Sequence, residues 1–307
     1  MSYRILVRDG IARNGIELLE TAGEVIDGGD LDLLGDVDAV VVRSRTKMTR
    51  EAILKATPRL RVIGRAGVGV DNIDLQAAKE AGVIVVNAPQ ASSIAVAEHT
   101  LALMFALSRM IPFADSSMRH GEWAKKQCRG VEMFGKTLGL IGLGRIGTEL
   151  GQRAKALGMQ VLGFDAFRNA EEIIARGAQA ASKEDLLQQS DYISLHVPLT
   201  KETRDLIDSA AIAKIKPGAF LICTARGGIV NEAALLWALN AGRLGGAALD
   251  VFLKEPPGAT PLIQHPNVIS TPHIAAQTVE AQERAGIEIA EEVLAALNGK
   301  TLRWRVV

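Results

Sequence analysis

Short apolar runs alternate with amphipathic segments along most of the chain. An apolar run of four to eight residues indicates a buried parallel strand, and apolar positions with a 3.6-residue period indicate a helix. In the first part, strands are predicted at 3–7, 38–42, 60–64 and 83–86, and helices at 11–21, 49–56 and 74–81. Thr49 and Asp74 are the expected helix N-caps. This alternation predicts a complete small α/β unit.

The same alternation continues after a long apolar helix at 94–110 and a short helical segment at 118–125. Further strands are predicted at 137–141, 159–164, 191–196, 220–224, 244–251 and 267–270, with helices at 145–157, 171–176, 183–189, 209–215, 231–241 and 278–297. The last helix is amphipathic, and we expect it to return to the first unit. The predicted domains are therefore 1–96 plus 283–307, and an inserted 97–282. The two chain crossings predict a hinge over a cleft.

A glycine-rich turn connects the strand and the helix that begin the inserted domain. Gly142 permits a tight turn, Gly144 lets the backbone approach a pyrophosphate, and Gly147 lets the helix pack against the strand. The helix N-terminus then faces the phosphates. Asp165 ends the next strand, eighteen residues after Gly147, where an acid binds the adenosine ribose. The pattern predicts a dinucleotide site; a plain tight turn or an S-adenosylmethionine site are the alternatives.

The composition limits the classes of function. The 307 residues are 48% hydrophobic, which supports two cores, and the net charge of zero does not indicate a nucleic-acid or acidic-membrane partner. Cys128 and Cys223 are isolated, the five histidines are far apart, and neither pattern suggests a metal site. No signal peptide or membrane-spanning run is evident, so we expect a cytoplasmic protein.

Three residues at strand ends match the needs of hydride exchange at a 2-hydroxy acid. Arginine binds a carboxylate with two parallel hydrogen bonds, which fits Arg226. Histidine titrates near neutral pH and can remove a hydroxyl proton, which fits His273. Glu255 can orient that histidine and stabilise its imidazolium. Taken alone, each residue also fits an ordinary role in a solvated loop or a cap.

Two other histidines are weaker candidates for chemistry. His196 precedes Pro198 at a strand end, and we expect it to be structural or to line the cofactor site. His99 lies on the apolar helix beside Glu98, and we expect a buried or hinge polar pair.

Ten short motifs, in order, resemble those of the D-isomer-specific 2-hydroxyacid dehydrogenases, and within them the phosphoglycerate dehydrogenases. They are 43–46 (RSRT), 65–74 (RAGVGVDNID), 87–89 (NAP), 96–100 (VAEHT), 142–147 (GLGRIG), 196–200 (HVPLT), 224–228 (TARGG), 248–252 (ALDVF), 255–256 (EP) and 271–273 (TPH). The resemblance covers essentially the whole chain. It implies an α/β fold of two doubly wound parallel-sheet domains: an inserted Rossmann NAD-binding domain and a discontinuous, flavodoxin-like substrate domain.

The resemblance also assigns residues to roles. It makes Arg226, Glu255 and His273 the catalytic set. Its implied cofactor contacts are Gly142, Gly144, Arg145, Ile146, Gly147, Asp165, His196, Val197, Pro198, Thr224, Ala225, Asp250 and Thr100. Its implied substrate contacts are Val68 and Gly69, through backbone amides that bind the carboxylate, together with Arg43, Ser44 and Arg45.

The 43–46 loop decides the expected substrate. Arg43 and Arg45 flank one residue at a strand end, and two cations there suit a phosphate. The alternative is that one arginine faces solvent and the other pairs with a carboxylate. With a phosphate site, the expected reaction is NAD-dependent oxidation of 3-phospho-D-glycerate, the first step of serine synthesis. A glyoxylate/hydroxypyruvate reductase, another D-2-hydroxyacid dehydrogenase or an NAD-sensing, corepressor-like binding protein are alternatives.

Further expectations concern the cofactor, the partner and two departures from the family pattern. Asp165 favours NAD over NADP, because the 2′-phosphate of NADP would meet its negative charge. The positive charge of Arg168, three residues on, would weaken this preference. The family implies a homodimer and a small phosphorylated 2-hydroxy acid as substrate. Gln90-Ala91-Ser92 replaces a Gly-Asn or Ser-Asn pair, so Ser92 is left out of the site. The chain ends at Val307, which predicts a short form without a C-terminal regulatory domain.

Overall fold

Two compact units make up the chain in the computed structural model, which describes residues 2–307. Unit 1 comprises the chain up to Ser93 together with Ala276–Val307, and unit 2 comprises Ile94–Ala275. The sequence placed these boundaries at 96 and 283. The second boundary lies earlier because the whole of α11 (Val279–Leu297) packs on α1 (Arg13–Glu20) and on the sheet of unit 1.

Unit 1 contains a parallel sheet of five strands in the order β2-β1-β3-β4-β5. The strands are β1 (Tyr3–Val7), β2 (Gly23–Asp27), β3 (Ala39–Val42), β4 (Val62–Arg65) and β5 (Ile84–Asn87). This is the flavodoxin-like order expected from the resemblance. The edge strand β2 was not predicted from the sequence, and none of its residues is fully buried.

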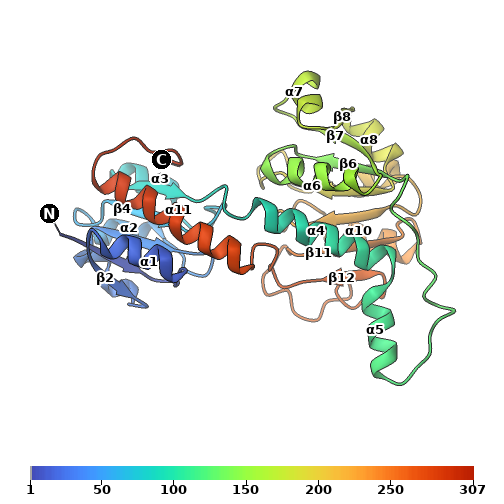
Figure 1. The fold of residues 1–307 in the computed structure, drawn as a ribbon, viewed down its shortest axis with the longest axis horizontal. Coiled ribbons are helices and arrows are strands. Elements are labelled where there is room, and N and C mark those ends of the chain that lie inside the picture. Colours follow the sequence, from blue (N-terminus) through green and yellow to red (C-terminus); the bar gives the residue numbers. More distant parts are fainter. Residues whose placement is uncertain (1) are drawn as a thin grey trace. The chain divides into compact units, whose positions relative to one another are not determined.

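Helices cover both faces of this sheet, and alternate residues of each strand feed two separate cores (Figure 1). Ile5 and Val7 pack on the side of α1 and α11, whereas Leu6 packs on the opposite side. That side is covered by η1 (Leu31–Asp36), α2 (Arg50–Ala56) and α3 (Leu75–Glu80). Thr49 and Asp74 accept hydrogen bonds from the N3 amides of α2 and α3, which confirms both predicted caps.

Unit 2 contains a parallel sheet of seven strands in the order β12-β11-β10-β9-β6-β7-β8. The strands are β6 (Thr137–Ile141), β7 (Gln160–Phe164), β8 (Gln179–Ala180), β9 (Tyr192–Leu195), β10 (Phe220–Cys223), β11 (Gly246–Leu249) and β12 (Val268–Ser270). The strand order reverses between β6 and β9. In such sheets, ligands bind beyond the carboxyl ends of the strands at this switch point.

The helices of unit 2 also form two layers. They are α4 (Ser93–Ser108), α5 (Ile111–Arg119), α6 (Arg145–Ala156), α7 (Ala170–Ala175), α8 (Lys183–Gln189), α9 (Ser209–Lys214) and α10 (Glu232–Asn240). One core joins the sheet to α4 and α6, and the other joins it to α8, α9 and α10.

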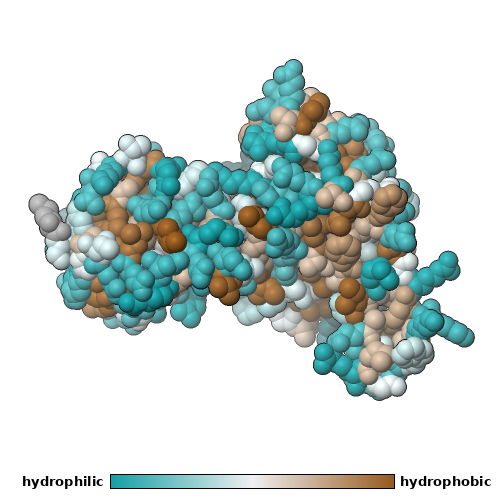
Figure 2. All heavy atoms as spheres, viewed as in Figure 1, coloured by the Kyte–Doolittle hydropathy of each residue, from teal (hydrophilic) through white to brown (hydrophobic). Residues whose placement is uncertain are grey.

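Helix α5 and the segment after it depart from the sequence prediction. The helix spans Ile111–Arg119, so the predicted helix at 118–125 was wrong. Pro112 lies in the first turn, where its missing N–H is tolerated. Hydrophobic residues gather on the visible surface around α4 and α5 (Figure 2). Within the described chain, no single helix is long and apolar enough to cross a bilayer; only α4 and α5 taken together would be, and they bend by 64°.

Candidate active site

The glycine turn after β6 has three distinct spatial requirements. Gly142 has a φ of +95°, and a Cβ there would lie 2.5 Å from the carbonyl oxygen of His196. A Cβ at Gly147 would lie 2.2 Å from the carbonyl oxygen of Gly142. A Cβ at Gly144 would meet no heavy atom within 4 Å. The first and third glycines are therefore required by packing, whereas the second leaves open space beside the backbone.

Helix α6 begins at this open space. Gly144 is its N-cap, and no side chain caps the first amides. Arg145 follows and is exposed, while Ile146 is half-buried. An uncapped helix N-terminus with room for a close approach fits a dinucleotide pyrophosphate.

Asp165 directly follows β7, and its carboxylate already organises the local backbone. Its Oδ2 accepts a hydrogen bond from the amide of Leu143 at 2.9 Å, and its Oδ1 accepts one from the amide of Phe167 at 3.0 Å. The Nε of Arg168 lies 3.5 Å from Oδ2. The acid therefore stabilises the glycine turn, and its place directly after β7 is compatible with the predicted ribose contact.

His196 forms the wall opposite the glycine turn. Its Nε2 lies 2.9 Å from the Oγ of Ser194, and its Nδ1 is buried without a hydrogen-bond partner within residues 2–307. Burial lowers the pKa of His196 to about 4, so the ring is neutral near pH 7. An enclosed imidazole with so low a pKa is a weak base, so His196 is a poor candidate for removing a substrate proton. Val197 and Pro198 continue from it along the edge of the turn.

Thr224 and Thr100 form a buried hydroxyl pair behind the end of β10. Their Oγ1 atoms are 3.0 Å apart, and that of Thr100 also donates to the carbonyl oxygen of Val96 at 2.7 Å. Thr100 has no exposed surface and Thr224 is 6% exposed. Both threonines were predicted to contact the cofactor. Thr100 is fully buried and hydrogen-bonds to Thr224, so it positions Thr224 and does not face a ligand itself.

Glu255 and His273 come together as a hydrogen-bonded pair. Their Oε2 and Nδ1 atoms are 2.8 Å apart, and the side chains are 38% and 44% exposed. The other oxygen of Glu255 accepts a hydrogen bond from the amide of Phe252 at 3.1 Å. Since Nδ1 is occupied by the carboxylate, Nε2 is the imidazole nitrogen available to exchange a proton with a substrate.

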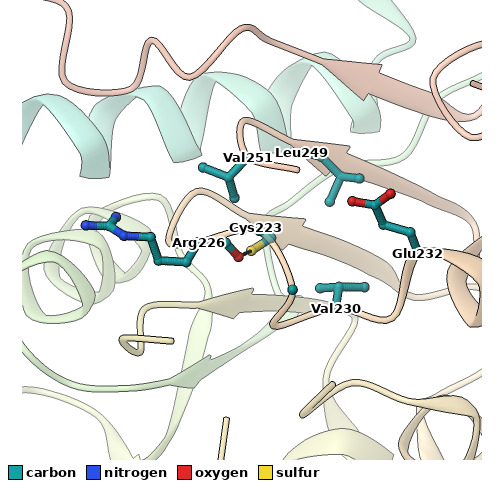
Figure 3. Close-up of a pocket in the computed structure, with 8 residues that line it drawn as sticks. Cys223, Arg226, Val230, Glu232, Leu249 and Val251 are labelled. Atoms are coloured by element: carbon teal, nitrogen blue, oxygen red, sulfur yellow. Dashed lines mark hydrogen bonds between the residues drawn. The ribbon is translucent and has the colours of Figure 1, made fainter. Parts of the chain in front are cut away.

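Arg226 lies on a loop that packs against the segment leading to Glu255. A Cβ at Gly227 would lie 1.8 Å from the carbonyl oxygen of Phe252, so only glycine permits this approach. The Nη1 of Arg226 donates to the carbonyl oxygen of Ala225 at 2.6 Å. The guanidinium points away from a cavity of about 10 Å³ that lies under the loop (Figure 3). The arginine therefore projects outward from the same loop cluster as the histidine–glutamate pair.

That small cavity has no features of a substrate site. It is lined in part by Cys223, Val230 and Leu249, and has room for about one water molecule. Burial raises the pKa of the Cys223 thiol to about 11, so the thiol stays protonated and unreactive. Within residues 2–307, no His, Cys, Asp and Glu side chains gather in threes as metal ligands.

Asp250 lies underneath the loop that carries His273. Its side chain has no exposed surface. It accepts hydrogen bonds from the Thr271 hydroxyl at 2.6 Å and from the amides of Ile274 and Ala275 at 2.9 Å each. The resemblance assigned Asp250 to the cofactor, but its contacts within the chain are with the loop that carries His273.

The expected pairing of His99 with Glu98 was wrong. Glu98 faces Arg153, with 3.7 Å between Oε1 and Nη2, whereas the Nε2 of His99 lies 3.2 Å from the Oγ1 of Thr271. Adjacent residues on a helix point in different directions, which explains the separation. His99 therefore lies next to the loop that carries His273.

In unit 1, the 43–46 loop is held from two sides. The carboxylate of Asp9 accepts hydrogen bonds from the amides of Arg43 and Thr46 at 2.7 and 3.2 Å, and from the Thr46 hydroxyl at 2.6 Å. The side-chain amide of Asn72 donates to the carbonyl oxygens of Arg43 and Thr46 at 2.8 and 2.5 Å. The sequence contained no signal for either residue's role, because both lie far from the loop along the chain.

The two arginines of this loop differ in their surroundings. Arg43 is half-buried, and burial lowers the pKa of its guanidinium, which Asp9 opposes and Arg45 reinforces. Arg45 is 78% exposed, with its Nε 3.5 Å from Asp9. Ser44 between them is exposed. Arg43 and Arg45 repel each other, and the nearby carboxylate of Asp9 already accepts three hydrogen bonds from the loop. An anion bound beside the two arginines would therefore be stabilised.

The 67–69 turn also fits an anion. The side-chain amide of Asn87 donates to the carbonyl oxygen of Val68 at 2.7 Å, and the amide of Ala88 donates to that of Gly67 at 3.0 Å. The amides of Val68 and Gly69 donate to no acceptor within residues 2–307. Two uncommitted amides on a held turn are suited to receive a carboxylate oxygen.

Comparisons with known proteins identify the family. Residues 101–275, more than half of the chain, match the NAD binding domain of the D-isomer specific 2-hydroxyacid dehydrogenases. The chain belongs to this family. Its NAD-binding domain is thus the part of unit 2 that carries the glycine turn and Asp165, which agrees with the fit of that turn to a dinucleotide.

Members of this dehydrogenase family with different substrates resemble the chain. D-3-phosphoglycerate dehydrogenase from Methanocaldococcus jannaschii is 48% identical over 97% of this chain, which spans 58% of that relative. A glyoxylate reductase from Paecilomyes thermophila has a TM-score of 0.90 and 30% identity, with 99% and 98% of the chains covered. D-lactate dehydrogenase from Aquifex aeolicus, complexed with NAD and lactic acid, has a TM-score of 0.83 and 32% identity, with 96% of both chains covered. The chain spans a little over half the length of the curated relatives it matches.

Proposed function

We propose that the protein oxidises the C2 hydroxyl of 3-phospho-D-glycerate to give 3-phosphohydroxypyruvate, with NAD as the oxidant, as the first step of serine biosynthesis. The observation that carries the proposal is the Glu255–His273 pair, joined at 2.8 Å next to the loop of Arg226. A base, its orienting acid and a cation for the carboxylate are the groups that oxidation of a 2-hydroxy acid requires.

The site residues have separate roles in the proposed reaction. The glycine turn and Asp165 of unit 2 would hold NAD, which would supply the acceptor for the hydride that leaves C2. The Nε2 of His273 removes the hydroxyl proton, and Glu255 stabilises the resulting imidazolium through Nδ1. Arg226 binds the carboxylate and polarises the developing carbonyl, and the amides of Val68 and Gly69 bind the carboxylate. His196 stays neutral and contributes only to the wall of the site.

The phosphate is assigned to Arg43 and Arg45. Supporting this choice are the loop geometry imposed by Asp9 and Asn72 and the 48% identity to a phosphoglycerate dehydrogenase. A glyoxylate or hydroxypyruvate reductase is the second candidate, favoured by the close structural likeness to a glyoxylate reductase. Its substrates lack a phosphate, so the two candidates differ in their need for the arginine loop.

Steady-state kinetics test the proposal directly. The purified protein is assayed with NAD and 3-phospho-D-glycerate, with a coupling reaction that removes the product. Unphosphorylated D-2-hydroxy acids are assayed in parallel, and glyoxylate and hydroxypyruvate are tested with NADH. We expect the highest kcat/KM for the phosphorylated acid. A higher value for an unphosphorylated substrate would replace this function by the second candidate.

We also propose that two copies associate through the surface around α4 and α5. This surface exposes large apolar side chains: Phe105, Ile111, Phe113, Met118 and Trp123, between 39% and 79% exposed. Exposed apolar patches of this kind mark interaction sites. Light scattering is expected to give the mass of two chains for the wild type and of one chain for Phe113→Asp. A monomeric wild type would contradict the proposal.

A further inference from the structure

The loop that carries His273 has an unusual backbone conformation. His273 has a φ of +54°, in the left-handed region that non-glycine residues rarely adopt. Its amide donates to the carbonyl oxygens of Asp250 and Thr271 at 2.9 and 3.0 Å. Such a conformation persists only where the surrounding structure enforces it.

The Asp250 carboxylate supplies most of the restraint. It accepts a hydrogen bond from the hydroxyl of Thr271, which precedes His273, and from the amides of Ile274 and Ala275, which follow it. The loop is therefore fastened on both sides of the histidine to one side chain. Asp250 is itself fixed, because its amide donates to the carbonyl oxygen of Cys223 at 3.0 Å in the buried sheet.

His99 on α4 extends this restraint. Because the Thr271 hydroxyl donates its only proton to Asp250, the hydroxyl oxygen is left to accept from the Nε2–H of His99, 3.2 Å away. The same Nε2 lies 3.6 Å from Asp250 Oδ1. The bonds thus run in one direction, from His99 to Thr271 to Asp250, and they fix which nitrogen of His99 carries the proton.

We propose that Asp250, Thr271 and His99 are positioning residues that hold His273 in its left-handed conformation and so keep Nδ1 against Glu255 and Nε2 free for the substrate. The proposal rests on the proposed function for its catalytic consequence. The proposed restraint on the loop conformation is independent of that function and can be measured without turnover. These residues act through His273 and need not touch the substrate.

A pair of variants at position 271 separates the hydroxyl from the side-chain shape. Thr271→Val removes both hydrogen bonds but keeps the shape, and Thr271→Ser keeps the hydroxyl. We expect kcat to fall about 10–100-fold in Thr271→Val, as for a misplaced catalytic group. Thr271→Ser should restore most of it, and the Kd of NADH, measured by fluorescence, should remain at the wild-type value in both. Thr21→Val, which removes an exposed threonine hydroxyl at the end of α1 in unit 1, serves as the matched control.

His99 provides a second, independent pair. Gln can place an N–H donor near the position of Nε2 and Leu cannot, so His99→Leu should lower kcat more than His99→Gln. Equal losses for Val and Ser at position 271, or for Leu and Gln at position 99, would overturn the proposed hydrogen-bond role. A wild-type kcat in both Thr271→Val and His99→Leu would overturn the proposal altogether.

Amide hydrogen exchange keeps the conformation separate from the reaction. The amides of Ile274 and Ala275, which donate to Asp250, should exchange at least about tenfold faster in Thr271→Val than in the wild type. Unchanged exchange would refute the restraint even if turnover fell. Conversely, if His273→Ala proved fully active, the proposed base would be wrong, while faster exchange in Thr271→Val would still support the restraint on the loop.

Discussion

The two units each hold a loop at the carboxyl end of a parallel sheet by means of one buried carboxylate. In unit 1, Asp9 accepts two amides and the hydroxyl of Thr46. In unit 2, Asp250 accepts two amides and the hydroxyl of Thr271. The loops differ in what they present: the first carries two arginines, and the second carries a histidine paired with a glutamate.

Asp9 and Asp250 can hold loops of different chemistry because both aspartates remain ionised. Burial alone would raise the pKa of either carboxyl, but hydrogen bonds to the ionised form outweigh it, so the pKa values of Asp9 and Asp250 lie below the ordinary 3.8. Each aspartate therefore stays charged. Hydrogen bonds from its own loop satisfy most of that charge. The outer surface of the loop can therefore carry arginines in unit 1 and a histidine in unit 2.

The largest expected effect comes from the basic loop. His273→Ala should lower kcat by about 10²–10⁴-fold, because the general base is lost. KM for the substrate should change little, because Arg43, Arg45 and Arg226 remain. His120→Ala, at an exposed position on the end of α5, is the control. Rapid-quench or steady-state rates would check this, and a kcat within twofold of the wild type would remove His273 from the mechanism.

A smaller and different effect is expected from the cationic loop. Arg45→Ala should raise KM for 3-phospho-D-glycerate about 10–100-fold, the size of a lost charge-assisted hydrogen bond, with little change in kcat. KM for an unphosphorylated 2-hydroxy acid should stay the same. Arg13→Ala, which removes another exposed cation, on α1, is the matched control. Equal losses on both substrates would show that the loop does not read a phosphate.

A third effect concerns stability in acid, where the two buried aspartates and His196 are expected to act in separate pH windows. The pKa of His196 is lowered from 6.5 to about 4, so between these values the unfolded chain binds a proton that the folded chain does not. Stability should therefore fall by up to about 3 kcal/mol as the pH drops from 6.5 to 4.

The carboxylates act below that window. Because their folded pKa values are lowered, their contribution is present above pH 3.8 and is lost as the pH falls below it. Denaturant unfolding at several pH values would resolve the two windows. In His196→Asn, the loss between pH 6.5 and 4 should shrink while the loss below 3.8 remains. The same slope in the variant and the wild type would assign the upper window to other groups.

Much of the fold could be predicted because buried strands and capped helices leave local signals. The apolar runs and caps such as Thr49 and Asp74 placed most elements within a few residues. The misses were elements without such a signal. Strand β2 is a half-exposed edge strand, β8 has only two residues, and α5 has a proline in its first turn, which resembles the end of a helix.

The candidate site divides in the same way. The glycines and the motif residues at strand ends were visible because a turn or a reaction requires those residue types. The sequence showed no sign of the contacts made by Asp9 and Asn72, or of the hydrogen bond between His99 and Thr271. These contacts join positions that are far apart in the sequence. Only the folded chain shows which carboxylate accepts which amide.

Asp165 has a consequence for how coenzyme preference can be altered. If it binds the ribose, as we expect, the same side chain both selects the coenzyme and fastens the backbone at Leu143. Replacing it to admit NADP would also remove a restraint on the turn that receives the pyrophosphate. Arg168, 3.5 Å from the carboxylate, could supply a cation for a 2′-phosphate but could not accept the Leu143 amide. A redesign that keeps the turn intact therefore needs a neutral acceptor such as asparagine at position 165.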